Sequence, residues 1–320
     1  MGDDINGLHH VGHLVHDMGL AMERYRQLGF TVPAPAHPVL PSVAGGPAEP
    51  FGVANTHVYF PGNFVELVAV IDDPGRMPAG ARPIPLQVPD DKLPGLRAAI
   101  RATAANITSF LQRFQGVHIM IADTPDIDGV AARLKADGVG HGGVHDIQRP
   151  VETSAGVRME PARYLEISDP DLSSGRVPEG RIGFAENAPI AASQDERHPD
   201  HPNGATGLVE CVLCVDDAAL PEWERRYDTY FGPAQGGDLT RFDRANVSVV
   251  AASALDDLLP GERPAALPAF VAYAVSVRDL AAAERLLLDN DVPIIRTGPQ
   301  EMFVPGDAAL GVAIIFRQDG

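Results

Sequence analysis

The sequence predicts an α+β fold built from four similar βαβββ units. A short apolar strand that runs into an acidic residue occurs four times, at residues 8–17, 116–123, 207–217 and 270–279. A helical pattern of about three turns follows each opening, and strands marked off by glycines follow each helix. Because one unit is too small to bury its own sheet, we expect the four units to pair into two domains.

The first unit shows the expected order of elements most clearly. Alternation of apolar and polar residues over 8–16 predicts a strand, and a helix is expected to begin at Asp17 and to end at Gly29. The unit is completed by three expected strands and one proline-rich loop: strands at Phe30–Val32, 54–60 and 63–70, and the loop over 33–52.

The other units follow the same order, with one insertion before the second. This insertion, about 74–114, holds a proline-rich stretch and an amphipathic helix around 95–113, whose apolar face must be buried. Expected helices lie at 126–136, 220–230 and 280–290, and expected strands at 141–148, 158–168, 181–187, 246–253 and 311–316. A polar segment, 188–204, is expected to link an N-terminal domain, 1–187, to a C-terminal domain, 205–320.

Composition narrows the classes of function. The net charge of −18 argues against a nucleic acid or an anionic membrane surface as partner. No apolar run reaches the roughly 18 residues of a membrane helix. Cys211 and Cys214 lie three apart in an expected strand, so they are predicted to be buried on opposite faces and not to form a zinc or redox pair. We expect a cytoplasmic protein with a small-molecule substrate, and the sequence leaves a homodimer open.

Four segments, in this order, resemble the vicinal oxygen chelate (VOC) superfamily and its glyoxalase-like branch. They are LHHVGHLVHD with a helix ending in RQLGF, GVANTHVYFPGNFVELVAV, HPNGATGLVECVLCV and ALGVAIIF. The resemblance covers most of the chain and implies that pairs of βαβββ units form curved mixed sheets around a half-open cup. The superfamily includes glyoxalase-type isomerases, extradiol dioxygenases, epimerases, fosfomycin-modifying enzymes and metal-free drug-binding (bleomycin-resistance) proteins. The fold therefore leaves the chemistry open.

The resemblance implies a metal-binding histidine on the first strand of a unit, several residues before the acidic residue that ends it. Counting back from Asp17 selects His10, and alternation places His9 on the opposite face. In the second unit the candidate is His118. Met120 is expected to share the face of His118 and to contact the substrate.

The resemblance also implies a metal-binding residue on the last strand of a unit. The candidates are Glu66 and Glu186, each in an otherwise apolar strand. Glu166 is a rival if the third strand of the second unit has been mistaken for the fourth. Asn55 and His57 share one face of their strand and are expected to contact the substrate.

Imidazole and carboxylate groups together suit Fe²⁺, Zn²⁺, Ni²⁺ or Mn²⁺, so a divalent metal is expected in the N-terminal pair of units. The expected ligands are His10, His118, Glu186 and Glu66. In the C-terminal pair, Glu210 occupies the position of His10 and the fourth unit offers only Ala272, so no metal is expected there.

Three functions remain open from the sequence. The first is a metal-dependent lyase or isomerase of the glyoxalase type, which would stabilise an enediolate and use Glu66 or Glu186 as catalytic base. The second is a non-haem Fe(II) dioxygenase of the extradiol type, with His10, His118 and Glu186 as ligands. The third is a metal-free protein that binds a small molecule without chemistry.

Overall fold

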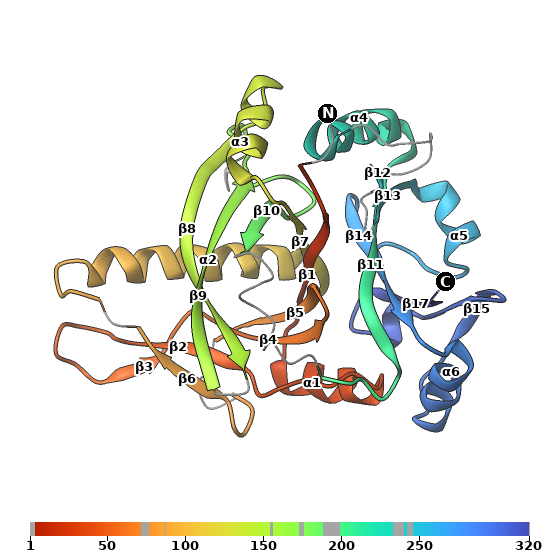
Figure 1. Cartoon of the computed structure of the whole chain (residues 1–320), viewed down its shortest axis with the longest axis horizontal. Coiled ribbons are helices and arrows are strands. Elements are labelled where there is room, and N and C mark those ends of the chain that lie inside the picture. Colours follow the sequence, from red (N-terminus) through yellow and green to blue (C-terminus); the bar gives the residue numbers. More distant parts are fainter. Residues whose placement is uncertain are drawn as a thin grey trace.

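Strand pairing in the computed structural model defines a curved mixed sheet in each half of the chain (Figure 1). The structure describes residues 4–71, 77–86, 88–153, 156–172, 176–187, 199–232, 240–241 and 246–319. The N-terminal strands are β1 (Gly7–Leu14), β2 (Ala36–Pro41), β3 (Ala48–Pro50), β4 (Val53–Phe60), β5 (Asn63–Val70), β6 (Arg82–Pro85), β7 (Gly116–Asp123), β8 (His141–Thr153), β9 (Gly156–Ile167) and β10 (Arg181–Asn187).

The N-terminal sheet consists of two units joined at their first strands. Its order is β2–β4–β5–β1–β7–β10–β9–β8, and the short strands β3 and β6 pair with β2. In each unit the first strand is parallel to the last, β1 to β5 and β7 to β10, while β1 and β7 are antiparallel. The two units are therefore related by an approximate twofold axis between β1 and β7.

The C-terminal sheet repeats this plan. Its strands are β11 (Ala205–Val215), β12 (Thr240–Arg241), β13 (Asn246–Ala251), β14 (Ala269–Val277), β15 (Ile295–Gly298), β16 (Glu301–Val304) and β17 (Ala313–Gln318). The order is β12–β13–β11–β14–β17–β16–β15, with β11 antiparallel to β14 at the centre. One residue pair, Val117 with Phe270, joins the two sheets. The predicted α+β class with curved mixed sheets is confirmed.

Each unit carries one helix after its first strand: α1 (Met18–Gln27), α3 (Ile127–Ala136), α4 (Leu220–Phe231) and α6 (Leu280–Asp289). Three of the four acidic residues before these helices, Asp17, Asp126 and Asp279, are N-caps whose carboxylates accept a backbone N–H two residues into the helix. In the second unit the cap is Asp126, whereas Asp123 ends β7. Asp126, and not Asp123, therefore corresponds to Asp17 of the first unit, and equivalent positions must be counted from it.

The segment between α1 and β4 differs from the prediction. Residues 30–32 form no strand, because the Thr31 N–H donates to His201 Nδ1 and the Thr31 hydroxyl donates to the Asp200 carbonyl. Pro33 and Pro35 then provide no N–H donors, and regular pairing begins only with β2. The expected proline-rich loop over 33–52 therefore contains both β2 and β3.

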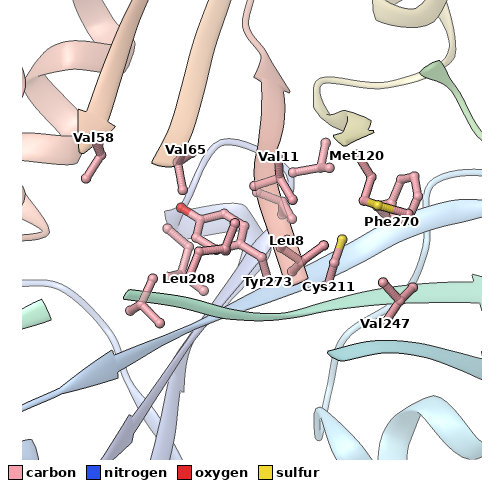
Figure 2. Packing of buried hydrophobic residues seen from close by; sticks show 14 of the residues in the cluster. Leu8, Val11, Val58, Val65, Met120, Leu208, Cys211, Val247, Phe270 and Tyr273 are labelled. Carbon is pink, nitrogen blue, oxygen red and sulfur yellow. The ribbon is translucent and has the colours of Figure 1, made fainter. Parts of the chain in front are cut away.

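The main core lies between the two sheets. Leu8, Val11 and Met120 from the N-terminal sheet meet Leu208, Cys211 and Tyr273 from the C-terminal sheet there (Figure 2), together with the inner sides of α1, α3, α4 and α6. Cys211 faces this core, whereas Cys214 faces the opposite side of β11, and both are fully buried free thiols. Their predicted burial on opposite faces is confirmed.

We call the face of each sheet that points away from this core its concave face. In the N-terminal half the inserted helix α2 (Leu93–Arg113) packs on it through Ile107 and Phe110. In the C-terminal half the short helix α5 (Leu255–Leu258) packs on it through Leu255. The predicted linker, 188–204, falls largely outside the described residues. No helix in the described part of the chain combines the length and the apolarity needed to span a membrane.

Candidate active site

The concave face of the N-terminal sheet carries a cluster of histidine and carboxylate side chains. Leu14 and Val68 pack toward α2 from this face, so strand alternation places His10 on β1 and Glu66 on β5 on the same side. His57 on β4 is the cross-strand partner of Glu66. The three polar side chains therefore come from three neighbouring strands of one unit.

Glu66 is the centre of this cluster. Its Oε1 atom accepts a hydrogen bond from Asn55 Nδ2 (2.8 Å) and lies 3.8 Å from His57 Nε2. Its Oε2 atom lies 4.0 Å from His10 Nε2. The His10, Glu66 and His57 side chains are 14%, 18% and 23% exposed, so the carboxylate is partly accessible and largely shielded from water.

Hydrogen bonds orient the His10 ring and fix its tautomer. Asn187 Nδ2 donates to His9 Nε2 (2.7 Å), so a neutral His9 carries its proton on Nδ1 and donates to His10 Nδ1 (2.7 Å). Burial, then the neighbouring charges of His9, His57 and Arg181, lower the pKa of His10 well below its ordinary value. His10 is therefore neutral, with its proton on the nitrogen that faces the carboxylate.

His57 is oriented in a similar way. The Tyr59 hydroxyl and His57 Nδ1 form a hydrogen bond (3.0 Å), which leaves His57 Nε2 toward Glu66. Phe64 stacks on the His10 ring, with centroids 4.6 Å apart and planes 5° apart, and contacts the His57 ring edge-on. The aromatic side chain thus separates the two imidazoles and limits their rotation.

Two β-bulges at the centre of the sheet alter the expected register. One extra residue interrupts each strand of the central pair, His9 on β1 and His118 on β7. The bulge brings His9 beside His10, contrary to the face that alternation predicts. The same register makes His118 the counterpart of His9. The counterpart of His10 is Ile119, which lies seven residues before Asp126 as His10 lies seven before Asp17.

The structure does not bring His118 to His10, so its predicted role as a partner ligand is wrong. His118 Nε2 donates to the Phe114 carbonyl (3.0 Å), and its buried ring stacks against Phe110 and Phe114 beside α2. Met120 lies in the core between the sheets and not on the concave face (Figure 2). Because the bulge at His118 shifts the alternation by one residue, these two predicted site residues lie on different faces.

Glu186 is also in a different place from the one predicted. Ala185 points to the concave face, so Glu186 points away from it, and its Oε2 accepts the Ile127 N–H at the start of α3 (2.7 Å). In the second unit, Gly183 occupies the register position of Glu66. That unit therefore supplies neither the histidine nor the carboxylate that the repeat predicts.

The rival carboxylate, Glu166 on β9, lies on the concave face but already has two cationic partners. Arg181 Nε donates to its Oε1 (2.5 Å), and Arg176 Nη1 forms an ion pair with its Oε2. Arg181 Nη2 also donates to the Tyr164 hydroxyl (3.1 Å). These contacts make Glu166 a partner of arginines and not a candidate metal ligand.

Sequence reasoning missed several polar residues of this face. Alternation could have found Tyr59, two residues after His57, and Arg181, which shares a face with Ala185. The contact of Asn187 with His9 depends on the bulge and has no sequence signal. As the side chains stand, no three His, Cys, Asp or Glu residues of the described chain are grouped so that they could hold a metal ion.

Paired βαβββ units in a curved mixed sheet, with a histidine and a carboxylate on neighbouring strands of the concave face, define the vicinal oxygen chelate class. The chain belongs to the glyoxalase-like domain family, whose sequence model matches residues 8–231. No curated protein sequence matches the chain significantly.

Solved structures show the same fold at low sequence identity. A hypothetical protein from Staphylococcus aureus aligns with a TM-score of 0.57 at 12% identity, covering 98% of this chain and 100% of its own. A mutant 4-hydroxymandelate synthase from Streptomyces coelicolor aligns with a TM-score of 0.53 at 12% identity, and the alignment covers 98% of this chain and 93% of the synthase. A Mn(II)-bound glyoxalase from Novosphingobium aromaticivorans aligns with a TM-score of 0.50 at 10% identity, and the alignment covers 98% of this chain and 82% of the glyoxalase.

Proposed function

We propose that the protein is an enzyme that moves a proton on a small molecule with oxygens on two adjacent carbons, at the concave-face site around Glu66. The position of the Glu66 carboxylate carries this proposal. It lies between the Nε2 atoms of His10 and His57, and Asn55 is hydrogen-bonded to one of its oxygens. Oε2, which Asn55 leaves open, is the atom placed to accept a proton.

The neutral His10 ring complements this base. Glu66 accepts the proton from the carbon that bears a hydroxyl group, and the electron pair of that C–H bond moves toward the adjacent carbonyl. The resulting enediolate oxygen accepts a hydrogen bond from His10 Nε2–H, the donor that the His9 and Asn187 contacts fix. Two proton movements then complete an isomerisation with all atoms conserved: the hydroxyl proton passes to the neighbouring enediolate oxygen, and Glu66 returns its proton to the carbon that bears that oxygen.

His10, His57 and Glu66 also carry the types of ligand atom that bind a divalent metal. His10 and His57 both have Nδ1 hydrogen-bonded and Nε2 facing one carboxylate, an orientation typical of metal-binding histidines. His10, His57 and Glu66 would hold the metal after closing from their separations of 4.0 and 3.8 Å. The His10 proton would then lie on Nδ1 and donate to His9 Nδ1, with the His9 proton on Nε2 and the Asn187 amide turned to accept it. A metal bound there would supply Lewis-acid stabilisation of substrate oxygens. The Mn(II)-bound structural neighbour supports this reading.

The same donor set supports a second candidate, an Fe(II)-dependent dioxygenase. Two imidazoles and one carboxylate are the ligand types of the non-haem iron oxygenases. The triad would be His10, His57 and Glu66, in place of the His10, His118 and Glu186 expected from the sequence. Oxygen uptake by the iron-loaded protein with catechols or 2-oxo acids would favour this candidate over proton transfer.

Deuterium incorporation from D₂O tests the proposed proton transfer without a known substrate. A panel of hydroxyketones, 2-hydroxy acids and 2-oxo acids is incubated with protein that has been treated with chelator or supplied with Mn²⁺, Ni²⁺, Zn²⁺ or Fe²⁺. NMR then reports loss of the C–H signal next to the oxygens. We expect exchange with the wild type and a loss of about 10²–10⁴-fold in Glu66→Gln, as for removal of a general base.

Glu186→Gln is the matched control, because Glu186 lies on the other face and a glutamine oxygen can still accept the Ile127 N–H. Exchange that survives in Glu66→Gln would refute the role of Glu66 as the base. Binding of a panel compound without exchange under every metal condition would favour a metal-free binding protein.

A further inference from the structure

A second polar cluster faces the Glu66 site across the same concave face. Arg181 at the start of β10 and Arg176 just before it share the Glu166 carboxylate, and the three side chains are 21%, 24% and 11% exposed. Both guanidinium groups therefore contact the same carboxylate. Arg181 Nη1 makes no hydrogen bond within the described residues, and it is the surplus donor of this cluster.

Strand register places this cluster in line with the proposed base. Glu66, Gly12, Ile119 and Arg181 are successive cross-strand neighbours on β5, β1, β7 and β10. Neighbouring strands lie about 4.8 Å apart, so β5 and β10 are separated by about 14 Å along the sheet. Both side chains project from the concave side of the sheet, so a ligand that lies across β1 and β7 can contact both.

Electrostatics support the same placement. Arg181 and Arg176 both contact the Glu166 carboxylate, so two guanidinium groups lie close together at this edge of the concave face. The chain as a whole carries −18, so this local positive charge stands out against its surroundings.

We propose that the substrate of this site carries a carboxylate, which binds Arg181 and Arg176 while its oxygen-bearing carbon lies at Glu66. The planar guanidinium group presents paired donors that match a carboxylate, and a half-buried setting strengthens such charge-assisted bonds. The substrate class is therefore a hydroxy-oxo acid, in which a hydroxyl-bearing carbon and its neighbouring carbonyl lie at Glu66 and a separate carboxylate reaches the arginines. This proposal rests on the proposed function, because the position of the reacting carbon follows from the role of Glu66.

Calorimetric titration with lactate and with propane-1,2-diol tests the proposal, because the two probes are similar in size but only lactate has a carboxylate. We expect the wild type to bind lactate at least about tenfold more tightly than the diol, and Arg181→Gln to lose about tenfold or more of the lactate affinity. Glu166→Gln should bind lactate more tightly than the wild type, because the competing carboxylate is gone.

Arg163→Gln is the control, since Arg163 lies on β9 but pairs with Asp128 on the opposite face. Its lactate affinity should equal that of the wild type. If Arg181→Gln does not fold, the gain expected in Glu166→Gln still decides the matter. Equal lactate affinity in wild type, Arg181→Gln and Glu166→Gln, or equal affinity of the wild type for both probes, overturns the proposal.

Glu66→Gln separates this proposal from the proposed function. If Glu66→Gln keeps its lactate affinity and loses deuterium exchange, both stand. If exchange proves independent of Glu66 while lactate binding still requires Arg181, the carboxylate site stands and the proton-transfer role of Glu66 falls. If exchange requires Glu66 but lactate affinity does not depend on Arg181, the proposed carboxylate site is refuted and the proposed role of Glu66 stands.

Discussion

The concave faces of the two sheets have the same backbone plan but different contents. In the N-terminal sheet Gly12 pairs with Glu66, and His10 lies two residues before Gly12. In the C-terminal sheet Val212 pairs with Ser248, and Glu210 lies two residues before Val212. Glu210 and Ser248 thus occupy the places of His10 and Glu66.

In the C-terminal sheet the Glu210 carboxylate has partners within the protein. Glu210 accepts a hydrogen bond from the Ser248 hydroxyl and pairs with Arg317 Nη2 at 2.9 Å. Around them the face is apolar, and Leu255 and Leu259 cover it. In the N-terminal sheet no lysine or arginine is paired with Glu66 among the described residues, and its neighbours are two imidazoles and an amide. The two sheets therefore differ in whether the carboxylate at this place has a guanidinium partner within the protein.

Paired substitutions at these matched positions give the largest expected contrast. Glu66→Gln should lower deuterium exchange by about 10²–10⁴-fold and leave the free energy of unfolding nearly unchanged. Glu210→Gln should leave exchange unchanged and lower the free energy of unfolding by roughly 1–3 kcal/mol, because Arg317 loses one of its two carboxylate partners. NMR exchange rates and urea denaturation measure the two effects, and loss of exchange in both variants would contradict the comparison.

The same comparison explains how much the sequence could predict. The strand and helix pattern predicted the fold because each unit repeats its caps, glycines and alternation. Within the first unit, the family resemblance selected His10 and Glu66, and alternation placed Asn55 and His57 on one face of their strand. The structure brings these four side chains into one cluster. These are local properties of neighbouring strands with simple register.

The partner residues of the second unit could not be predicted from the same rules. Alternation assumes an uninterrupted strand, but bulges at His9 and His118 each add one residue. The acidic residue that marks the end of the strand was taken as Asp123, whereas the helix cap is Asp126. Glu186 was then selected by its apolar neighbours, although its own face is set by pairing that only the folded sheet reveals.

A buried carboxyl group where the two halves meet gives the second contrast. Glu179, in the turn before β10, lies 3.3 Å from the Tyr227 hydroxyl and 4.0 Å from Arg226 Nη1, both on α4. Burial raises its pKa to about 7, with Tyr227, Arg226 and Arg113 opposing the shift. Unlike Glu66, which is 18% exposed, this carboxyl is fully buried. It holds its proton in the folded protein at pH 6.

The sign of the pH effect follows from this raised pKa. The folded state keeps the Glu179 proton up to about pH 7, whereas the unfolded chain releases it near its ordinary pKa of 4.5. The stability that this group contributes is complete below pH 4.5 and is lost as the pH rises to about 7, a loss of roughly 3 kcal/mol.

Glu179→Gln, which cannot ionise, should therefore gain roughly 2–3 kcal/mol over the wild type at pH 8 and almost nothing at pH 4.5. Urea denaturation at both pH values measures the difference, and Glu222→Gln on the exposed side of α4 is the control. An equal effect of Glu179→Gln at both pH values would show that the carboxyl is ionised in the folded protein.

The smallest expected effect concerns a buried hydrogen-bond chain that ties the two sheets together. His13 Nε2 donates to the Leu310 carbonyl (2.9 Å), so His13 Nδ1 is an acceptor. The Tyr25 hydroxyl donates to His13 Nδ1 (2.7 Å). The Tyr273 hydroxyl in turn donates to the Tyr25 oxygen (2.9 Å). Burial lowers the pKa of His13 to about 4, which agrees with a neutral ring at neutral pH.

Tyr273→Phe removes only the last donor of this chain and should lower the free energy of unfolding by about 1 kcal/mol. Tyr25→Phe leaves both His13 Nδ1 and the Tyr273 hydroxyl buried without a partner, so it should cost about two to three times as much. Urea denaturation of both variants, followed by fluorescence and circular dichroism, measures the order. A larger loss of unfolding free energy in Tyr273→Phe than in Tyr25→Phe would show that Tyr25 is not the central residue of this hydrogen-bond chain. Separate transitions for the two halves in either variant would show that this chain couples two sheets that otherwise unfold independently.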